Sequence, residues 1–280
     1  MRICLALAAM LFVVPVASAA QQKASDVLKP PKKNISSSPI TDRFALRITY
    51  FAPSVDTLFR LDPDGGLLKG TLLSAENNLG LDDKVSQARM EMIFRINENN
   101  RMRVDYFKLA RSGDQIVTGP IIFGNNVFLA NDRVQTALEW RSLGFTYSRS
   151  VYRSERFEAG VGLGVSFVEA RARGAVVARN IREERSAVAG FPMFALDGTW
   201  RISKRWALTG RGQRISANIN DFSGLVADYH GDIQYRLKGN FAVGLGYTRL
   251  RTNVDVVSSS FSGLYHQDVA GPEVFIRASF

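Results

Sequence analysis

The sequence predicts an all-β protein, a transmembrane antiparallel up-and-down β-barrel of about ten strands, with eight to twelve compatible with the pattern. Two observations carry this prediction. Stretches of strand length with alternating apolar and polar residues recur from Phe44 to Phe280. After the N-terminal segment no apolar run reaches the roughly 20 residues that a transmembrane helix needs, whereas a barrel strand needs only about 9–11 alternating residues.

Residues 1–19 are predicted to be a secretory signal peptide. Arg2 gives the positive start, an apolar stretch runs from Ile3 to Val14, and the small residues 17–19 form a cleavage site. Cys4 is the only cysteine, and it lies inside this signal. The mature chain therefore excludes disulfides, thiolate catalysis and cysteine-ligated metals, and no cofactor or metal is expected.

Residues 20–42 are polar and rich in Pro, Ser and Lys, which predicts a disordered periplasmic N-terminal tail. The barrel domain is predicted over 43–280. The formal charge of +10 falls to +9 without the signal, because Arg2 is its only charged residue. An exported basic protein rarely meets nucleic acid, so the expected anionic counterparts are outer-membrane lipid and lipopolysaccharide.

Strand 156–167 has the clearest alternation. Phe157, Val161 and Phe167 belong to a face of lipid-like character, whereas Glu158 and the intervening glycines and Ser166 form a face suited to an enclosed lumen. The alternating glycines predict clearance for that lumen and tolerance of a small side chain at Gly162. The same argument gives ten crossings, at 44–50, 88–96, 102–110, 134–147, 156–167, 188–202, 205–213, 225–236, 241–248 and 274–280.

Turn signals divide into two kinds. Short polar turns are predicted at 97–100, 150–154, 203–204 and 238–240, and longer loops at 62–84, 124–132, 170–187, 216–223 and 252–262. Short turns at one end and long loops at the other are typical of outer-membrane barrels. Segments 67–76 and 115–123 have poorer apolar bands; they are either two further strands or the rims of loops, and we favour rims.

Charged residues recur on the predicted inward faces. A barrel of this size is narrow and filled by side chains, so opposite charges there are expected to pair with each other. The predicted lumen network consists of Arg89, Glu91, Arg95, Asp228, His230, Asp232, Arg236 and Arg277. The alternative is a narrow conduction path for small solutes.

The two histidines give the only indications of an enzyme. His230 shares a strand face with Asp228 and Asp232, and His266 lies two residues from Asp268. An acidic group beside a histidine orients and charges it, as a hydrolase needs. The pattern resembles, weakly, the Asp/His pairs of outer-membrane proteases of the omptin family, whose sites lie at the extracellular rim. The simpler interpretation is a hydrogen-bonded lumen histidine and a loop histidine.

The last residues, "VFIRASF", place Val274, Ile276 and Phe280 on one side of a strand that ends with the sequence. Because lipid offers no hydrogen bonds to a free strand edge, this strand is expected to pair with residues near Phe44 and close the barrel. With the signal peptide and the alternating strands, this ending resembles Gram-negative outer-membrane β-barrel proteins of the small OmpA-like or porin-like class. The resemblance implies that these three residues are the signal recognised by the barrel-assembly machinery.

The segment 169–187 is the richest in arginine, and it lies between two clear strands. We expect Arg173, Arg179, Arg182 and Arg185 to contact lipopolysaccharide phosphates, or else to form a solvated loop partly neutralised by Glu183 and Glu184. The sequence thus predicts an integral outer-membrane barrel with a structural or surface-interaction role and no identified catalytic activity. The alternatives are a passive channel and a rim protease or lipid-modifying hydrolase. No oligomeric state is indicated.

Overall fold

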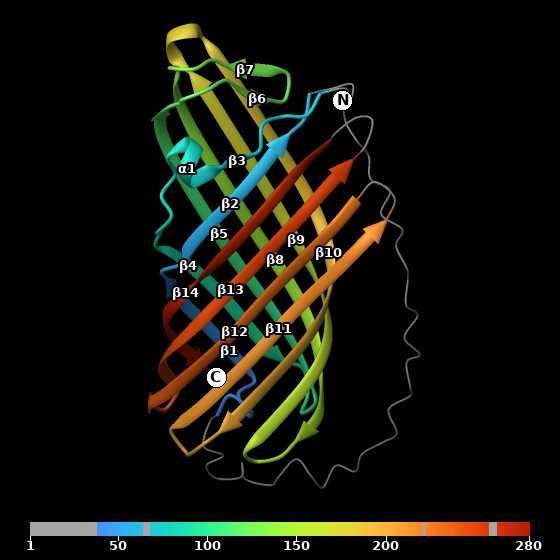
Figure 1. Cartoon of the computed structure of the whole chain (residues 1–280). Coiled ribbons are helices and arrows are strands. Elements are labelled where there is room, and N and C mark those ends of the chain that lie inside the picture. The colour runs from blue at the N-terminus through green and yellow to red at the C-terminus, as the bar shows by residue number, and fades with distance from the viewer. Residues whose placement is uncertain (1–37, 64–67, 220–221, 258–261) are drawn as a thin grey trace, which may run out of the picture. The chain divides into compact units, whose positions relative to one another are not determined.

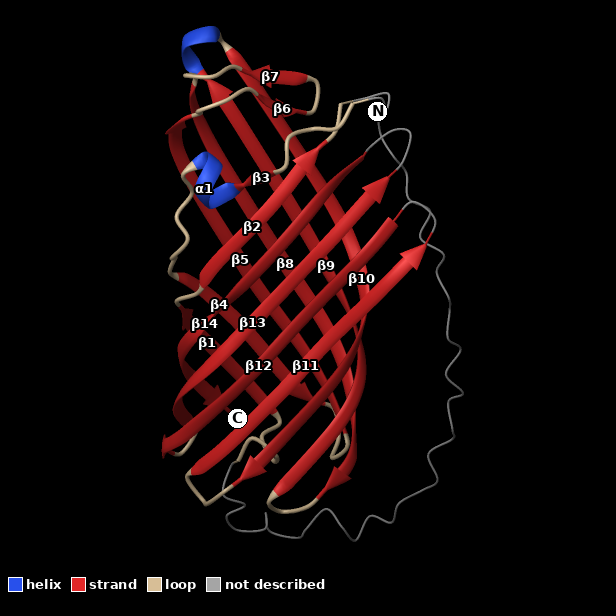
Figure 2. Ribbon diagram, viewed as in Figure 1, coloured by secondary structure: helices blue, strands red, loops and turns tan. Residues whose placement is uncertain are grey.

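The computed structural model describes residues 38–63, 68–219, 222–257 and 262–280. The predicted signal peptide and most of the predicted tail therefore lie outside the described residues. The described chain is almost entirely β-structure (Figure 2). It contains no helix long and apolar enough to cross a membrane.

The described strands form one closed antiparallel barrel of ten strands (Figure 1). β1 (Phe44–Phe51) and β2 (Ser54–Leu61) both pair with the final strand, so together they occupy one interrupted strand position. The other nine follow in chain order: β4 (Gln87–Arg95), β5 (Asn100–Ile116), β8 (Arg133–Arg153), β9 (Phe157–Val176), β10 (Ile181–Arg201), β11 (Trp206–Ile219), β12 (Phe222–Lys238), β13 (Phe241–Val257) and β14 (Ser262–Ser279). The preference for ten strands is confirmed.

The barrel closes where the sequence predicted. β1 pairs with β14 from Ala45 opposite Ser279 to Phe51 opposite Glu273. The backbone N–H of Phe280 donates to the carbonyl of Phe44 at 2.8 Å, and the N–H of Phe44 donates back at 3.0 Å. The two rings lie 6.3 Å apart. These pairings satisfy the facing edges of β1 and β14 and close the sheet at the short-turn end.

The predicted inward and outward faces are also confirmed. On β9, Val161, Leu163 and Phe167 are exposed on the outer wall, whereas Glu158 and Ser166 are buried. On β14, Val274 and Ile276 point outward, and the alternate residues are buried. The outer wall is therefore apolar over the middle of the strands.

One end of the barrel has short turns and the other has the long connections. At the short-turn end, Ile96 and Asn100 are joined by a backbone hydrogen bond of 2.9 Å, and the β10–β11 and β12–β13 turns are equally tight. At the long-loop end lie β3 (Leu73–Ser74), α1 (Ala75–Leu79) and the separate β6 (Ile121–Phe123) and β7 (Asn126–Phe128) hairpin. The segments 67–76 and 115–123 thus contribute no barrel crossing of their own, beyond the residues at the end of β5.

Three predicted loops and the end of the predicted tail have wrong boundaries. Strands run into the predicted loops 216–223 and 252–262, because β11 continues to Ile219, β12 begins at Phe222, β13 continues to Val257 and β14 begins at Ser262. The predicted loop 170–187 is mostly strand, because β9 continues to Val176 and β10 begins at Ile181, with only η2 (Val177–Arg179) and Asn180 between them. At the N-terminal side, the predicted disordered tail includes residues 38–42. They instead form a turn in which Ser38, Ile40 and Asp42 are buried. Contacts with distant strands, which no local pattern reveals, hold this turn.

Apolar side chains fill the upper part of the barrel interior, toward the long-loop end. One cluster lies across the wall strands and contains Phe51, Val55, Phe107, Leu109, Trp140, Val168 and Val269. The second lies under the long connections and includes Phe59, Leu73, Leu79, Phe123, Phe128 and Leu138. The interior is therefore mainly charged toward the short turns and mainly apolar toward the long loops, where Arg111 and Thr57 are among the buried polar residues.

Candidate functional site

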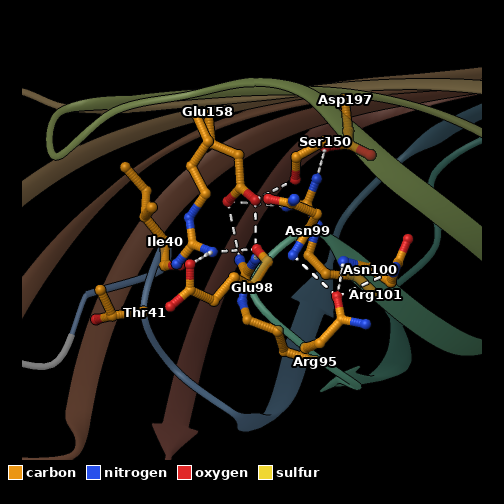
Figure 3. A network of polar contacts seen from close by, with 12 residues as sticks. Ile40, Thr41, Arg95, Glu98, Asn99, Asn100, Arg101, Ser150, Glu158 and Asp197 are labelled. Atoms are coloured by element: carbon orange, nitrogen blue, oxygen red, sulfur yellow. Dashed lines mark hydrogen bonds and ion pairs between the residues drawn. The ribbon is translucent and has the colours of Figure 1, made fainter. Parts of the chain in front are cut away.

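The lumen near the short turns is organised around Glu158 on β9. Its carboxylate accepts hydrogen bonds of 2.8 Å from both terminal nitrogens of Arg95, and it lies 3.4 Å from Arg101 (Figure 3). The Ser150 hydroxyl also donates to it, and Arg101 forms a second ion pair with Asp197. Glu158 is fully buried. This bidentate geometry is the strong form of an arginine–carboxylate pair.

Midway along the barrel, an arginine of β1 reaches a carboxylate on β12, which is not its neighbour in the wall, and another on β14, which pairs with β1. Arg47 of β1 forms ion pairs with Asp232 of β12, at 2.8 Å, and with Glu273 of β14. His230 Nε2 lies 2.7 Å from Asp232 Oδ2, and His230 Nδ1 lies 2.8 Å from the Thr248 hydroxyl. Every polar atom of the His230 ring therefore has a partner inside the wall.

A second group of charges lies on β4, β5, β11 and β12. Arg89 lies 2.5 Å from Asp228 and 3.4 Å from Asp105. Glu91 pairs with Arg211. The structure thus brings Arg89 and Asp228 of the predicted network together, whereas Glu91 and Arg95 have partners, Arg211 and Glu158, that the sequence-based network left out.

The buried turn at residues 38–42 completes the short-turn end. Asp42 accepts hydrogen bonds from Arg236 at 3.1 Å and from Arg277 at 3.3 Å. The Ile40 carbonyl accepts one from Arg153 at 3.2 Å. Two of the predicted lumen arginines are thus held by a residue from the predicted tail. The polar composition of this segment predicts disorder, and nothing in the local sequence indicates that Asp42 is buried and pairs with arginines.

The predicted Asp/His pairs do not form a rim site. His230 is 5% exposed and lies among lumen side chains, and Asp228 beside it pairs with Arg89. His266 lies 3.4 Å from Asp255, whereas Asp268 accepts from Arg249 and Arg251. The alternative of a rim Asp/His site therefore has no support from His266 and Asp268, whose nearer partners are on β13. His230 is the hydrogen-bonded lumen histidine of the simpler interpretation, whereas His266 lies on β14 and not in a loop.

Charged side chains form a cross-strand row on the outer wall, next to its apolar part on the side of the long loops. Tyr106, Leu143 and Phe167 are cross-strand neighbours on β5, β8 and β9, and all three are exposed. Two residues further toward the long loops, the neighbours in register are Lys108, Arg141 and Glu169. The outer wall thus changes from apolar to charged within two residues along each of these three strands.

Above that boundary a hollow of about 250 Å³ lies on β5, β8 and β9. Ala110, Ser112 and Ala137 are among its lining residues, with Arg171 and Arg173 beside them. Arg173 lies 3.0 Å from Glu184, and Arg171 lies 3.0 Å from Glu169. We call this hollow with its charged neighbours Lys108, Glu139, Arg141, Glu169, Arg171, Arg173 and Glu184 the wall ladder.

The four arginines predicted to contact lipopolysaccharide lie on the β9–β10 hairpin. Arg173 belongs to the wall ladder, and Arg182 is exposed 4.0 Å from Glu184. The side chains of Arg179 and Arg185 lie outside the described residues. Sequence reasoning missed Lys108 and Arg141, which strand pairing brings beside the arginines of the segment 169–187.

At the long-loop ends of β5 and β8, Arg133 Nε donates a 2.8 Å hydrogen bond to Asp114. This hydrogen bond holds the pKa of the Asp114 carboxyl below its ordinary value. Both side chains are well exposed. The pair is therefore an ordinary surface ion pair at the same end of the barrel as the loops.

Comparison with known proteins finds similar folds among solved structures but no similar sequence. No family model and no curated protein sequence matches the chain. Among solved structures, the outer-membrane protease OmpT from Escherichia coli aligns with a TM-score of 0.54 at 10% identity, over 87% of this chain and 98% of that one. The toluene transporter TodX of Pseudomonas putida (TM-score 0.37, 7% identity, 88% and 91% coverage) and the attachment protein Ail of Yersinia pestis (0.35, 10%, 83% and 99%) also align. The chain therefore has the fold of the outer-membrane β-barrel proteins, in its ten-stranded form.

Proposed function

We propose that the protein is an integral outer-membrane barrel with a filled lumen, acting in a structural or surface-interaction role and not as a catalyst. Its predicted signal peptide exports it. The assembly machinery recognises Val274, Ile276 and Phe280, whose side chains lie together on the outer face at the end of β14. With the C-terminus on the periplasmic side, the long loops are extracellular.

The ion-pair network of the lumen is the observation that carries the filled-barrel proposal. Arg47, Arg89 and Arg95 extend from β1 and β4 to carboxylates on β9, β12 and β14. Pairs of this kind bridge the interior, and breaking one leaves an uncompensated buried charge. An open conduction path needs these side chains to be solvated, which their burial does not favour.

Conductance in a planar bilayer tests this proposal. The protein is refolded, and its insertion is established beforehand by vesicle flotation and by slower migration on gels after boiling. We expect inserted protein to give no discrete current steps. Reproducible steps from inserted wild-type protein would instead establish the passive channel.

The surface role that the wall ladder favours is binding of lipopolysaccharide phosphates. Lys108, Arg141 and Arg171 lie immediately above lipid-facing residues, at the height of a lipid headgroup, and an adjoining hollow gives a phosphate room. Arginine suits phosphate through its planar pair of donors. The acidic neighbours reduce the net charge, so the binding is expected to be collective and sensitive to salt.

Two sets of substitutions compare the basic residues next to the lipid-facing wall with the four arginines of the β9–β10 hairpin. One variant changes Lys108, Arg141 and Arg171 to Gln, and the other changes Arg173, Arg179, Arg182 and Arg185 to Gln. Both are expected to fold and to bind lipopolysaccharide more weakly than wild type at low salt. Unchanged binding in both variants would show that these arginines are merely solvated.

A hydrolase has less support. OmpT is a protease, but His230 is buried in the lumen of this chain, and Asp228 and Asp232 are both paired with arginines. A cleavage assay with casein and with lipopolysaccharide, comparing wild type and His230→Ala, tests the alternative. Turnover that depends on His230 would replace the non-catalytic proposal.

A further inference from the structure

The wall of the barrel is interrupted between β2 and β5. β4 pairs with β5 only as far as Arg89 opposite Phe107. Beyond Phe107, the described part of β5 pairs with β8 alone. β2 pairs with β14 and, over two residues, with β3. Two strand edges thus border a gap in the sheet, and α1 lies beside it (Figure 1).

Capping residues at both ends define α1, and a glycine on β5 allows the helix to pack closely against that strand. The Ser74 side chain accepts from the Asn77 N–H at 3.1 Å and caps the helix start, and Gly80 ends the helix with a φ of 66°. A Cβ at Gly113 of β5 would lie 2.4 Å from the Leu79 carbonyl oxygen. The close approach of α1 to the β5 backbone therefore requires glycine there.

One carboxylate joins both edges of the gap. Glu76 of α1 accepts a hydrogen bond of 2.5 Å from Arg111 of β5 and one of 3.1 Å from the backbone N–H of Thr57 of β2. Arg111 also donates to the Thr57 hydroxyl at 2.6 Å. Thr57 is fully buried and Arg111 is 5% exposed. Glu76 is thus a latch between two strands that do not pair with each other.

Behind α1 lies the apolar cluster of the long-loop end. Leu79 of α1 and Phe59 of β2 line a cavity of about 30 Å³ together with Phe123, Phe128 and Leu138. Thr136 and Arg173 also line it, and every other lining residue is apolar or glycine. We call this space the chamber. Its volume admits no more than about two water molecules in the latched state, so a larger occupant requires α1 to move.

We propose that α1 is a movable panel in the barrel wall, latched by Glu76, and that its release admits a small uncharged hydrocarbon to the chamber. The chamber lining selects an apolar ligand because it offers almost no partner for a polar one. Arg111 and Thr57 remain on the wall when α1 leaves, and the ion pair reforms when it returns. This route crosses the side of the barrel and does not need an open lumen, so it is independent of the filled-barrel proposal.

Thiol reactivity inside the chamber tests the latch. The mature chain has no cysteine, so Leu138→Cys gives a single probe in the chamber wall. Ala45→Cys gives a buried control probe at the other end of the barrel. Each cysteine variant is combined with Glu76→Gln, which removes the charge of the latch, or with the control Asp114→Asn. Asp114→Asn removes an exposed ion pair at the long-loop end, where α1 also lies. The measurement is the rate at which N-ethylmaleimide modifies each cysteine in protein folded in lipid vesicles.

We expect Glu76→Gln to raise the reaction rate of the Leu138→Cys probe by about tenfold or more, and Asp114→Asn to leave it unchanged. The Ala45→Cys probe should remain slow in all backgrounds. In the Glu76→Gln background, n-decane should slow the Leu138→Cys reaction and leave the Ala45→Cys rate unaltered. An unchanged rate, or an equal rise at both probes, would overturn the latch. Absence of protection by decane would overturn the hydrocarbon ligand.

Discussion

A single inward residue, Glu158, organises one level of the lumen. Its two oxygens hold Arg95, Arg101 and Ser150, which come from three different strands. Alternation along 156–167 predicts that Glu158 faces inward, but it cannot predict Arg95 and Arg101 as its partners, because both are distant in sequence. Strand register determines which charged residues meet in the lumen, and a single sequence does not reveal that register directly.

Removing the Glu158 charge should destabilise the barrel strongly. Glu158→Gln keeps the shape of the side chain but leaves Arg95 and Arg101 with less compensation in a buried site. We expect the free energy of unfolding to fall by about 3–5 kcal/mol in a urea titration of protein folded in vesicles. The control Glu98→Gln alters a side chain that is 93% exposed, and should change it by less than about 0.5 kcal/mol. Equal effects would show that Glu158 is solvated.

Strand β9 shows what alternation predicts and what it misses. The lipid face was predicted residue by residue, and the structure confirms it. The inward glycines were interpreted as clearance for the lumen, with a small side chain tolerated at Gly162. That interpretation is wrong, because a Cβ at Gly162 would lie 2.3 Å from the Tyr147 carbonyl oxygen of β8. Close approach of the neighbouring strand, which the glycine pattern alone does not distinguish from an open lumen, requires this glycine.

A charged substitution on the outer face of β9 tests whether that face contacts lipid. Val161 is 43% exposed on the outer wall. Val161→Arg should reduce the free energy of unfolding by about 2–4 kcal/mol if the position is near the bilayer centre, because lipid does not solvate the guanidinium. Val161→Leu should have little effect. The measurement is the same vesicle titration, and equal tolerance of both substitutions would place Val161 away from lipid.

The last residue should matter for assembly because it completes the pairing of β14 with β1. Deleting Phe280 removes both backbone hydrogen bonds to Phe44 and the ring contact. We expect less heat-modifiable protein in the outer-membrane fraction of cells, whereas Phe280→Tyr should assemble normally. Normal assembly of the deletion variant would show that closure and recognition do not depend on Phe280.

At the scale of the whole molecule, the sequence predicted the closed barrel, the strand count and the wall that faces lipid. Each of these follows from a repeated local pattern. The buried turn at Asp42, the apolar upper interior and the gap beside α1 were not predicted. Phe59, Leu79 and Phe123 come from three separate segments, and only their meeting inside the barrel distinguishes an apolar cluster from scattered loop residues.

The depth of the three tryptophans in a bilayer tests the account most directly. Trp200 and Trp206 are exposed on the outer wall near the short turns, whereas Trp140 is 6% exposed and stacks on Tyr265 inside the barrel. Single-tryptophan variants, with the other two changed to Phe, are refolded into vesicles containing phospholipids brominated at different acyl depths. For a lipid-embedded barrel with a filled interior, we expect strong quenching of Trp200 and Trp206 by the shallowest bromines and little quenching of Trp140 at any depth. Equal quenching of all three, or quenching of none, would contradict a lipid-embedded barrel with a filled interior.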